Sequence, residues 1–182
     1  MEQSPPRYDL WPPTLRHAMR LRGALIPCGP GVRGIGWPDT PRVRLSAIAG
    51  ALSGNQFATL LTAAWVWGAA EDPGDPLSVA GFAGRARTQH TREVHRYELR
   101  ISEAEVARLG QFGVTTPLRT ILDLLHLSPT FGEIEQHSCR ELLSIAQIST
   151  EELSQLLITL RRPHIRLARE RWREISLEHR VA

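Results

Sequence analysis

A threonine–proline step that leads from an extended run into an apolar helix constrains the fold of this 182-residue chain most strongly. Threonine is a favoured helix N-cap and proline is favoured at the first helical position, so Thr116 and Pro117 predict a helix over 117–127. Its apolar residues recur at helical spacing: Leu118, Ile121, Leu122 and Leu125. Because Val114 precedes this helix in a short extended piece, strand and helix are expected to share one core.

The rest of the chain mixes helical and extended patterns, which predicts the α+β fold class. Apolar residues at helical spacing predict further helices over 14–22, 42–52, 56–68, 102–109, 130–143, 150–161 and 165–175. Short apolar or alternating runs bounded by glycine and proline predict strands over 24–27, 32–37, 77–83 and 93–101. The C-terminal part is therefore expected to be a mixed α/β domain that ends in helices.

The basic residues exclude several classes of enzyme. All 22 of them are arginine, and without lysine the chain has neither a Walker A phosphate loop nor a Schiff-base nucleophile.

Gly29, Gly31 and Gly34 match the G-x-G-x-x-G pattern of dinucleotide-binding folds, but the residues that follow cannot open a helix. No acidic residue lies between Asp39 and Glu71, where the ribose-binding carboxylate belongs. A hairpin turn is the better interpretation of these glycines.

Other catalytic and metal-binding patterns also fail. The histidines and cysteines lack the spacing of zinc ligands, and Asp72 and Asp75 stand in a proline–glycine loop. We therefore expect no catalytic residue, no metal and no cofactor, and the chain is predicted not to be an enzyme. Cys28 and Cys139 are expected to be buried free thiols. With no apolar segment long enough to span a membrane and no signal peptide, a cytoplasmic location is expected.

The N-terminal third carries the excess of positive charge. Residues 1–60 hold seven arginines and three acidic residues, whereas residues 61–182 hold 15 arginines and 16 acidic residues. A short arginine-bearing helix followed directly by a two-stranded turn is typical of a recognition helix and wing. DNA contacts are therefore predicted at four arginines: Arg16, Arg20, Arg22 and, on the wing, Arg33. A solvated helix beside a packing hairpin explains the same pattern equally well.

A second group of arginines lies near the C-terminus, over 161–173. Glu170 and Glu174 dilute its charge, so a solvated helix face is the favoured interpretation of this group over a phosphate-binding one.

Four stretches, in this order along the chain, carry a family resemblance: LTAAWVWGA (61–69), HRYEL (95–99), SEAEV (102–106) and GVTTPLRTILDLL (113–125). The last is the most specific, with matches at Val114, Thr115, Thr116, Pro117, Arg119, Thr120 and Asp123. Together they resemble the AbiEi-type antitoxins of type IV toxin–antitoxin systems, in particular their actinobacterial winged-helix regulator-like members. The resemblance covers about residues 13–175.

The resemblance implies an antitoxin that represses its own promoter and neutralises a nucleotidyltransferase-like toxin encoded next to it. It implies a DNA-binding N-terminal winged helix and a C-terminal domain required for antitoxicity. Family members have two further helices before the recognition helix, so the chain is expected to hold a shortened, partial winged-helix segment over 1–42. Residues 43–182 are expected to form the AbiEi-like C-terminal domain.

The matched motif residues Thr115, Thr116, Pro117, Arg119 and Asp123 have a structural interpretation that we favour over a binding role. Thr116 caps the helix, Pro117 begins it, and Arg119 pairs with Asp123 four residues on at the helix surface, tying the helix to neighbouring strands. The leading hypothesis is an antitoxin-like transcriptional regulator. The alternative is a protein-interaction module that keeps only the C-terminal scaffold and does not bind DNA.

Overall fold

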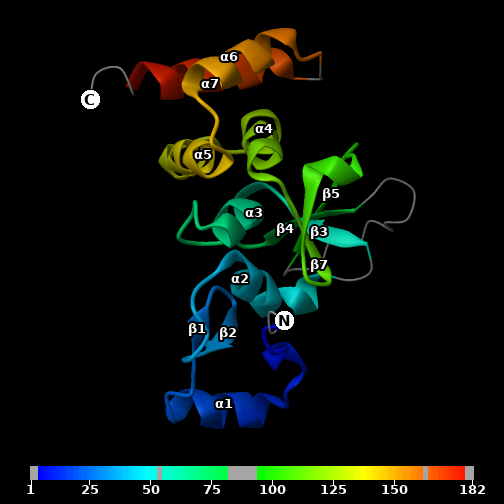
Figure 1. Cartoon of the computed structure of the whole chain (residues 1–182), viewed down its shortest axis with the longest axis vertical. Coiled ribbons are helices and arrows are strands. Elements are labelled where there is room, and N and C mark those ends of the chain that lie inside the picture. The colour runs from blue at the N-terminus through cyan, green and yellow to red at the C-terminus, as the bar shows by residue number, and fades with distance from the viewer. Residues whose placement is uncertain (1–3, 53–54, 82–93, 162–163, 179–182) are drawn as a thin grey trace.

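The computed structural model describes residues 4–52, 55–81, 94–161 and 164–178, and it is built in tiers along one long axis (Figure 1). A short helix and a two-stranded hairpin form one end, a five-stranded sheet with its helices forms the middle, and two helices form the other end. The chain contains both helices and strands, with β4 to β7 following one another and α4 to α7 coming after them, which confirms the α+β class.

The α-helices are α1 (Pro13–Leu21), α2 (Pro41–Ala47), α3 (Leu60–Trp67), α4 (Pro117–Leu127), α5 (Glu133–Ala146), α6 (Thr150–Thr159) and α7 (Ile165–Glu178). Single-turn 3-10 helices are η1 (Tyr8–Leu10), η2 (Ala49–Ala51) and η3 (Glu103–Glu105). The strands are β1 (Leu25–Cys28), β2 (Gly31–Gly34), β3 (Gln56–Ala58), β4 (Leu77–Gly81), β5 (Val94–Glu98), β6 (Val106–Leu109) and β7 (Phe112–Thr115).

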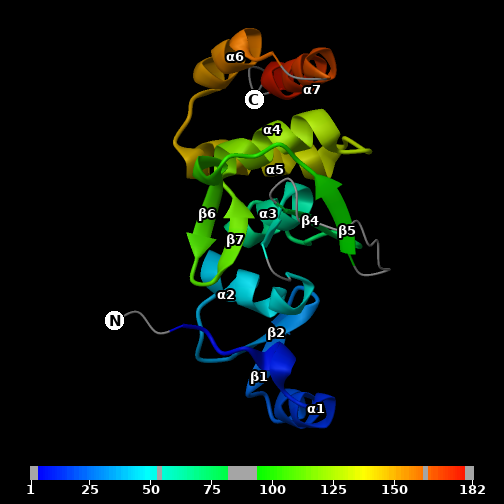
Figure 2. The same ribbon diagram turned by 90° about the vertical axis from the view of Figure 1, so that its right-hand side faces the viewer.

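The central sheet has the order β5-β4-β3-β7-β6. Its middle strand β3 is antiparallel to β4 and parallel to β7, β5 is parallel to β4, and β6 closes an antiparallel hairpin with β7. Figure 2 shows α4 and α5 lying across the end of this sheet, with α6 and α7 stacked beyond them. One hydrophobic core runs through all three tiers, from Cys28 in the hairpin to Trp172 and Ile175 in α7.

The threonine–proline step behaves as the sequence predicts. β7 ends at Thr115, and the Thr116 hydroxyl accepts a hydrogen bond from the backbone N–H of Arg119 at 3.4 Å. Pro117 is the first residue of α4, and Ile121 and Leu125 are fully buried. Because the cap and the proline act within one turn, the start of this helix is decided locally.

Two of the predicted helices are partly strand. Gln56–Ala58 forms β3, where Phe57 and Ala58 lie in the centre of the sheet between β4 and β7. Residues 102–109 make only the single turn η3 and then β6. Ser102 and Glu105 form a capping box at η3, but Val106 pairs with Thr115 of the next strand, β7. In both places strand pairing outweighs local helical spacing, with distant strands for β3 and within a hairpin for β6.

The C-terminal arginines hold helices together. The Arg171 guanidinium donates to the carbonyl oxygens of Leu125 at 3.0 Å and Ser128 at 2.8 Å, at the end of α4. Arg169 in the same way donates to Leu157 O at 2.9 Å near the end of α6. Unpaired carbonyls at a helix C-terminus attract cations, so these two side chains satisfy the ends of neighbouring helices. The prediction of a solvated face is therefore wrong for Arg169 and Arg171.

The predicted domain boundary after residue 42 falls inside α2, and the stated division remains a prediction. Within the described ranges, none of the helices is long and apolar enough to cross a membrane. The same part of the chain contains no group of three or more His, Cys, Asp or Glu side chains that could hold a metal ion. Cys28 and Cys139 are both buried free thiols, as expected.

Candidate nucleic-acid interface

The predicted N-terminal helix and the hairpin after it are both present. α1 spans Pro13–Leu21 with Arg22 as its C-cap, and Gly23, with a φ of +71°, lets the chain turn back into β1. The hairpin pairs Leu25 with Gly34 at its open end and Cys28 with Gly31 next to its turn. No residue of α1 is buried, so the helix presents most of its surface to solvent at one end of the molecule (Figure 1). We call α1 and the open end of the hairpin the N-terminal arginine surface.

The four arginines predicted to contact DNA differ in solvent exposure and in hydrogen bonding. Arg20 and Arg22 are exposed, at the C-terminal end of α1. Arg16 is half-buried, and its Nε atom is shielded from solvent without a hydrogen-bond acceptor in the described part of the chain. Arg33 is half-buried too, because its Nη1 donates to the Trp37 carbonyl oxygen at 2.5 Å. Arg20 and Arg22 are thus the residues most ready for a phosphate.

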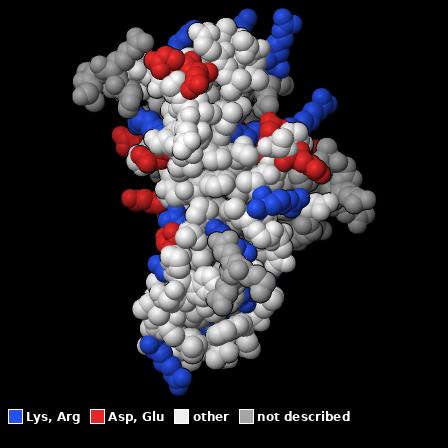
Figure 3. All heavy atoms as spheres, in the orientation of Figure 1, with Lys and Arg blue, Asp and Glu red and all other residues white. Residues whose placement is uncertain are grey.

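Both carboxylates within residues 4–52 are paired with arginines outside this set. Arg7 Nε donates to Asp9 Oδ1 at 2.7 Å. Arg44 donates two hydrogen bonds to the Asp39 carboxylate, from Nε at 2.8 Å and from Nη2 at 2.9 Å. The four candidate arginines make no salt bridge in the described ranges. On the face drawn in Figure 3, the end formed by α1 shows arginine atoms and no acidic ones.

The hairpin is not a free wing, because its turn is seated on the body of the protein. A Cβ atom added to Gly29 would lie 2.7 Å from the Trp65 ring, and one added to Gly31 would lie 2.2 Å from the Ala47 carbonyl oxygen. Only glycine allows so close an approach. The turn therefore points toward α2 and α3, and Arg33 stands near the open end beside α1 rather than at a projecting tip.

The segment before α1 ties this end to the sheet. Ser46 in α2 donates to the Pro6 carbonyl oxygen at 3.3 Å, and Arg42 donates to Ser4 Oγ at 3.1 Å. The Arg7 guanidinium lies 5.0 Å from the centre of the Phe112 ring, within cation–π range. Together with the seated hairpin turn, these contacts hold α1 from two sides.

Acid is expected to weaken the ion pair between Arg44 and Asp39. The hydrogen bond from Arg44 lowers the pKa of the Asp39 carboxyl, so this ion pair stabilises the fold above about pH 4 and its contribution is lost as the pH falls through the lowered pKa. Asp39→Asn should cost at most about 1 kcal/mol at pH 7, because the pair is partly exposed, and should flatten the loss of stability in acid. Urea unfolding at a series of pH values measures both effects. Glu141→Gln, at an exposed position, should leave the acid profile of the wild type unchanged.

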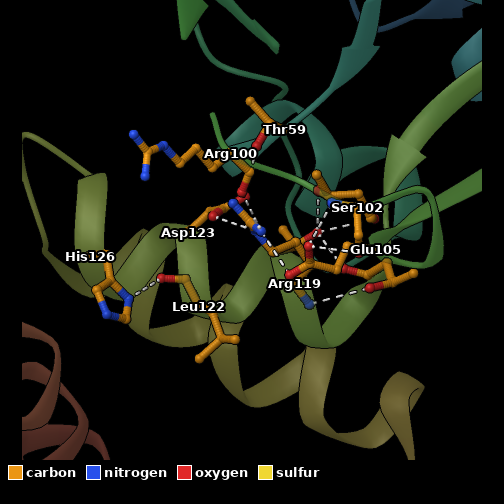
Figure 4. Close-up of polar contacts among 11 residues, drawn as sticks. Thr59, Arg100, Ser102, Glu105, Arg119, Leu122, Asp123 and His126 are labelled. Atoms are coloured by element: carbon orange, nitrogen blue, oxygen red, sulfur yellow. Dashed lines mark hydrogen bonds and ion pairs between the residues drawn. The ribbon is translucent and has the colours of Figure 1, made fainter. Parts of the chain in front are cut away.

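The motif residues Arg119 and Asp123 pair as predicted, but inside the protein rather than on its surface. Arg119 Nε donates to Asp123 Oδ1 at 2.8 Å, and the two side chains are only 4% and 3% exposed. Figure 4 shows the same guanidinium reaching Glu105, at 2.7 Å, and the Arg100 carbonyl oxygen, at 3.3 Å. The expected surface position is therefore wrong, since Thr59, the Arg100 backbone and Glu105 of η3 contact the pair from outside α4.

Burial works to lower the pKa of Arg119, but the charges of Asp123 and Glu105 outweigh it. The net result is a raised pKa, so the guanidinium stays charged. Thr59, directly before α3, donates to Asp123 Oδ2 at 3.1 Å. The network thus joins α4 to the η3 turn and to the start of α3, rather than to strands as the sequence predicts.

Two contributors to these sites were missed by sequence reasoning. The Glu105 carboxylate accepts from the Ser102 backbone N–H and also completes the Arg119 network, although no sequence pattern links Glu105 to Arg119. Arg44 was not singled out, yet it binds Asp39, donates to the Trp65 carbonyl oxygen at 2.7 Å and lies over the Trp65 ring. The roles of Glu105 and Arg44 depend on contacts in the folded structure, which no sequence pattern reveals.

No protein-family model, no curated protein and no solved structure matches this chain. The function is therefore argued from the residues and their geometry.

Proposed function

We propose that the chain is an antitoxin-like transcriptional regulator of the cytoplasm, which binds promoter DNA through the N-terminal arginine surface and neutralises a nucleotidyltransferase-like toxin. The observation that carries the DNA part is the pair of exposed arginines, Arg20 and Arg22, on a helix with no buried residue. The two acidic residues within 4–52, Asp9 and Asp39, are paired with other arginines. Positive charge at this end is therefore available to phosphates.

The shape of this end suits a DNA groove. A helix of nine residues is about 13 Å long, and the major groove of B-DNA is about 12 Å wide, so α1 can enter it end-on or lengthwise. Because α1 forms one extremity of the molecule, the sheet and the C-terminal helices lie away from it and leave room for the duplex (Figures 1 and 2). Arginine binds phosphate oxygens, and it also binds guanine in two-pronged fashion.

Arg20→Ala is expected to weaken binding to the DNA upstream of the gene roughly three- to tenfold, because one charged donor is lost. The plot of log K against log salt concentration should become shallower by about one unit if Arg20 neutralises a phosphate. Fluorescence anisotropy of labelled promoter DNA across a salt titration measures both quantities.

Arg173→Ala is the matched control, since it removes an exposed arginine from the opposite end of the molecule. Affinity and slope should remain those of the wild type in this variant. Equal losses in both variants would mean that binding follows net charge alone, and no loss in Arg20→Ala would exclude α1 as the contact.

The toxin part of the proposal rests on the resemblance to AbiEi-type antitoxins in the segment 113–125. The test is growth of cells that express a neighbouring nucleotidyltransferase-like gene, with and without this chain. Restored growth supports the proposal, and continued arrest in the presence of folded protein contradicts it.

One observation favours the second candidate, an interaction module that does not bind DNA. The turn of the hairpin packs on Trp65 and Ala47 instead of projecting as a wing. Under this alternative, promoter DNA remains unbound even at low salt while toxin neutralisation persists.

A further inference from the structure

A cleft of about 880 Å³ lies between the N-terminal end of the molecule and the sheet. Arg16 of α1 and the hairpin turn line one side, and the loop that holds Asp72 and Asp75 lines the other. Its size is that of small-molecule sites, which are common where two parts of a protein meet. The DNA proposal does not use this cleft.

One side of the cleft offers a cation. Arg16 is partly exposed, and it makes no salt bridge in the part of the chain that the structure describes. An acidic group in the cleft would gain a charge-assisted hydrogen bond from this guanidinium. Asp9 also lines this side, but its carboxylate is held by Arg7 through two hydrogen bonds.

The other side offers carboxylates on a fixed support. The Thr62 hydroxyl donates to the Pro73 carbonyl oxygen at 2.7 Å and accepts from the Ser78 backbone N–H at 2.8 Å, so the loop is anchored to α3. Asp72 accepts from the backbone N–H of Gly74 at 2.7 Å, while Asp75 is exposed and makes no salt bridge in the described ranges. Arg96 also lines the cleft and has interactions of its own.

The cleft has an arginine on one side and two carboxylates on the other. We therefore propose that it binds a small linear zwitterion, with its acid group at Arg16 and its amine at Asp72 and Asp75. A simple anion would meet the two loop carboxylates, and a simple cation would meet Arg16. Only a molecule with both charges matches both sides, because each charged group then gains a charge-assisted hydrogen bond.

Occupancy of the cleft would control DNA binding, a consequence that rests on the proposed function. Arg16 belongs to α1 and is one of the four candidate DNA contacts, and a guanidinium that is turned into the cleft and bound to a ligand offers fewer donors to a phosphate. Ligand and DNA therefore compete, and each lowers the affinity of the other by the same factor.

The test is calorimetric titration of the full chain with a series of amino acids of growing length: glycine, β-alanine, γ-aminobutyrate and ε-aminocaproate. Caproate and hexylamine, which carry one charge each, are the matched controls. We expect one member of the series to bind at least tenfold more tightly than either control. The proposal is overturned if no member of the series binds, or if a control binds equally well.

Variants locate the binding. Arg16→Gln and Asp75→Asn should each weaken it about tenfold or more, since each removes a charged partner, whereas Arg20→Gln, outside the cleft, should not change it. Binding that survives both cleft variants contradicts the proposal.

Adding the bound zwitterion to the anisotropy assay should weaken DNA binding at least threefold. If the chain binds no DNA at all, the regulator proposal fails while the calorimetric result still decides on the cleft.

Discussion

Arg119→Ala is expected to lower the free energy of unfolding by about 3 to 5 kcal/mol, the largest loss among the substitutions considered for this chain. The substitution leaves the Asp123 carboxylate, 3% exposed, without its cation in the interior, and it releases Glu105 from α4. Removing one partner of a buried ion pair costs far more than the pair itself contributes, because an uncompensated charge remains. Urea unfolding followed by tryptophan fluorescence measures the loss.

Arg173→Ala removes an arginine of the same size from an exposed position and should change stability by no more than about 0.5 kcal/mol. A loss in Arg119→Ala no larger than this control would show that the buried network is not what joins α4 to η3. Asp123→Asn, which keeps the shape of the side chain and removes its charge, should lie between the two.

Gly31→Ala is expected to cost about 1 to 3 kcal/mol, although it adds a single methyl group. The new Cβ would lie 2.2 Å from the carbonyl oxygen of Ala47, and that backbone atom cannot rotate away as the end of a side chain would. Relief requires the hairpin turn to lift from α2, which also loosens the position of α1.

Gly36→Ala is the matched control, since nothing lies within 4 Å of the Cβ that it would add. This variant should be neutral, or gain up to about 1 kcal/mol through a less flexible unfolded chain. Thermal unfolding of the two variants side by side separates steric conflict from loss of glycine itself. Equal behaviour of the two would contradict the seating of the turn on the body.

Features decided within a few residues could be predicted from the sequence. Thr116 and Pro117 placed the start of α4 correctly, because capping and the fixed proline φ act within one helical turn. Ser149 and Glu152 mark the start of α6 in the same way. The exposure of Arg20 follows from its place on a short polar helix.

Features decided by distant parts of the chain could not be predicted. Gln56–Ala58 fits a helical pattern, and only its pairing with β4 and β7 makes it the centre of the sheet. The spacing of Arg119 and Asp123 predicts their contact but not their burial, which depends on η3 and the start of α3 packing against α4. The glycine spacing predicts the hairpin turn. It does not predict that Gly29 packs on the Trp65 ring, because that contact joins parts of the chain that are distant in the sequence.

The central claim is that the N-terminal arginine surface meets DNA phosphates, and arginine footprinting tests it most directly. All basic residues are arginine, so modification by phenylglyoxal with and without promoter DNA, followed by mass spectrometry, surveys the whole cationic surface at once. We expect DNA to protect Arg20 and Arg22, while Arg166 and Arg173, exposed on α7, react as before. Unchanged reactivity of Arg20 and Arg22 in the presence of bound DNA, with protection elsewhere, would contradict it.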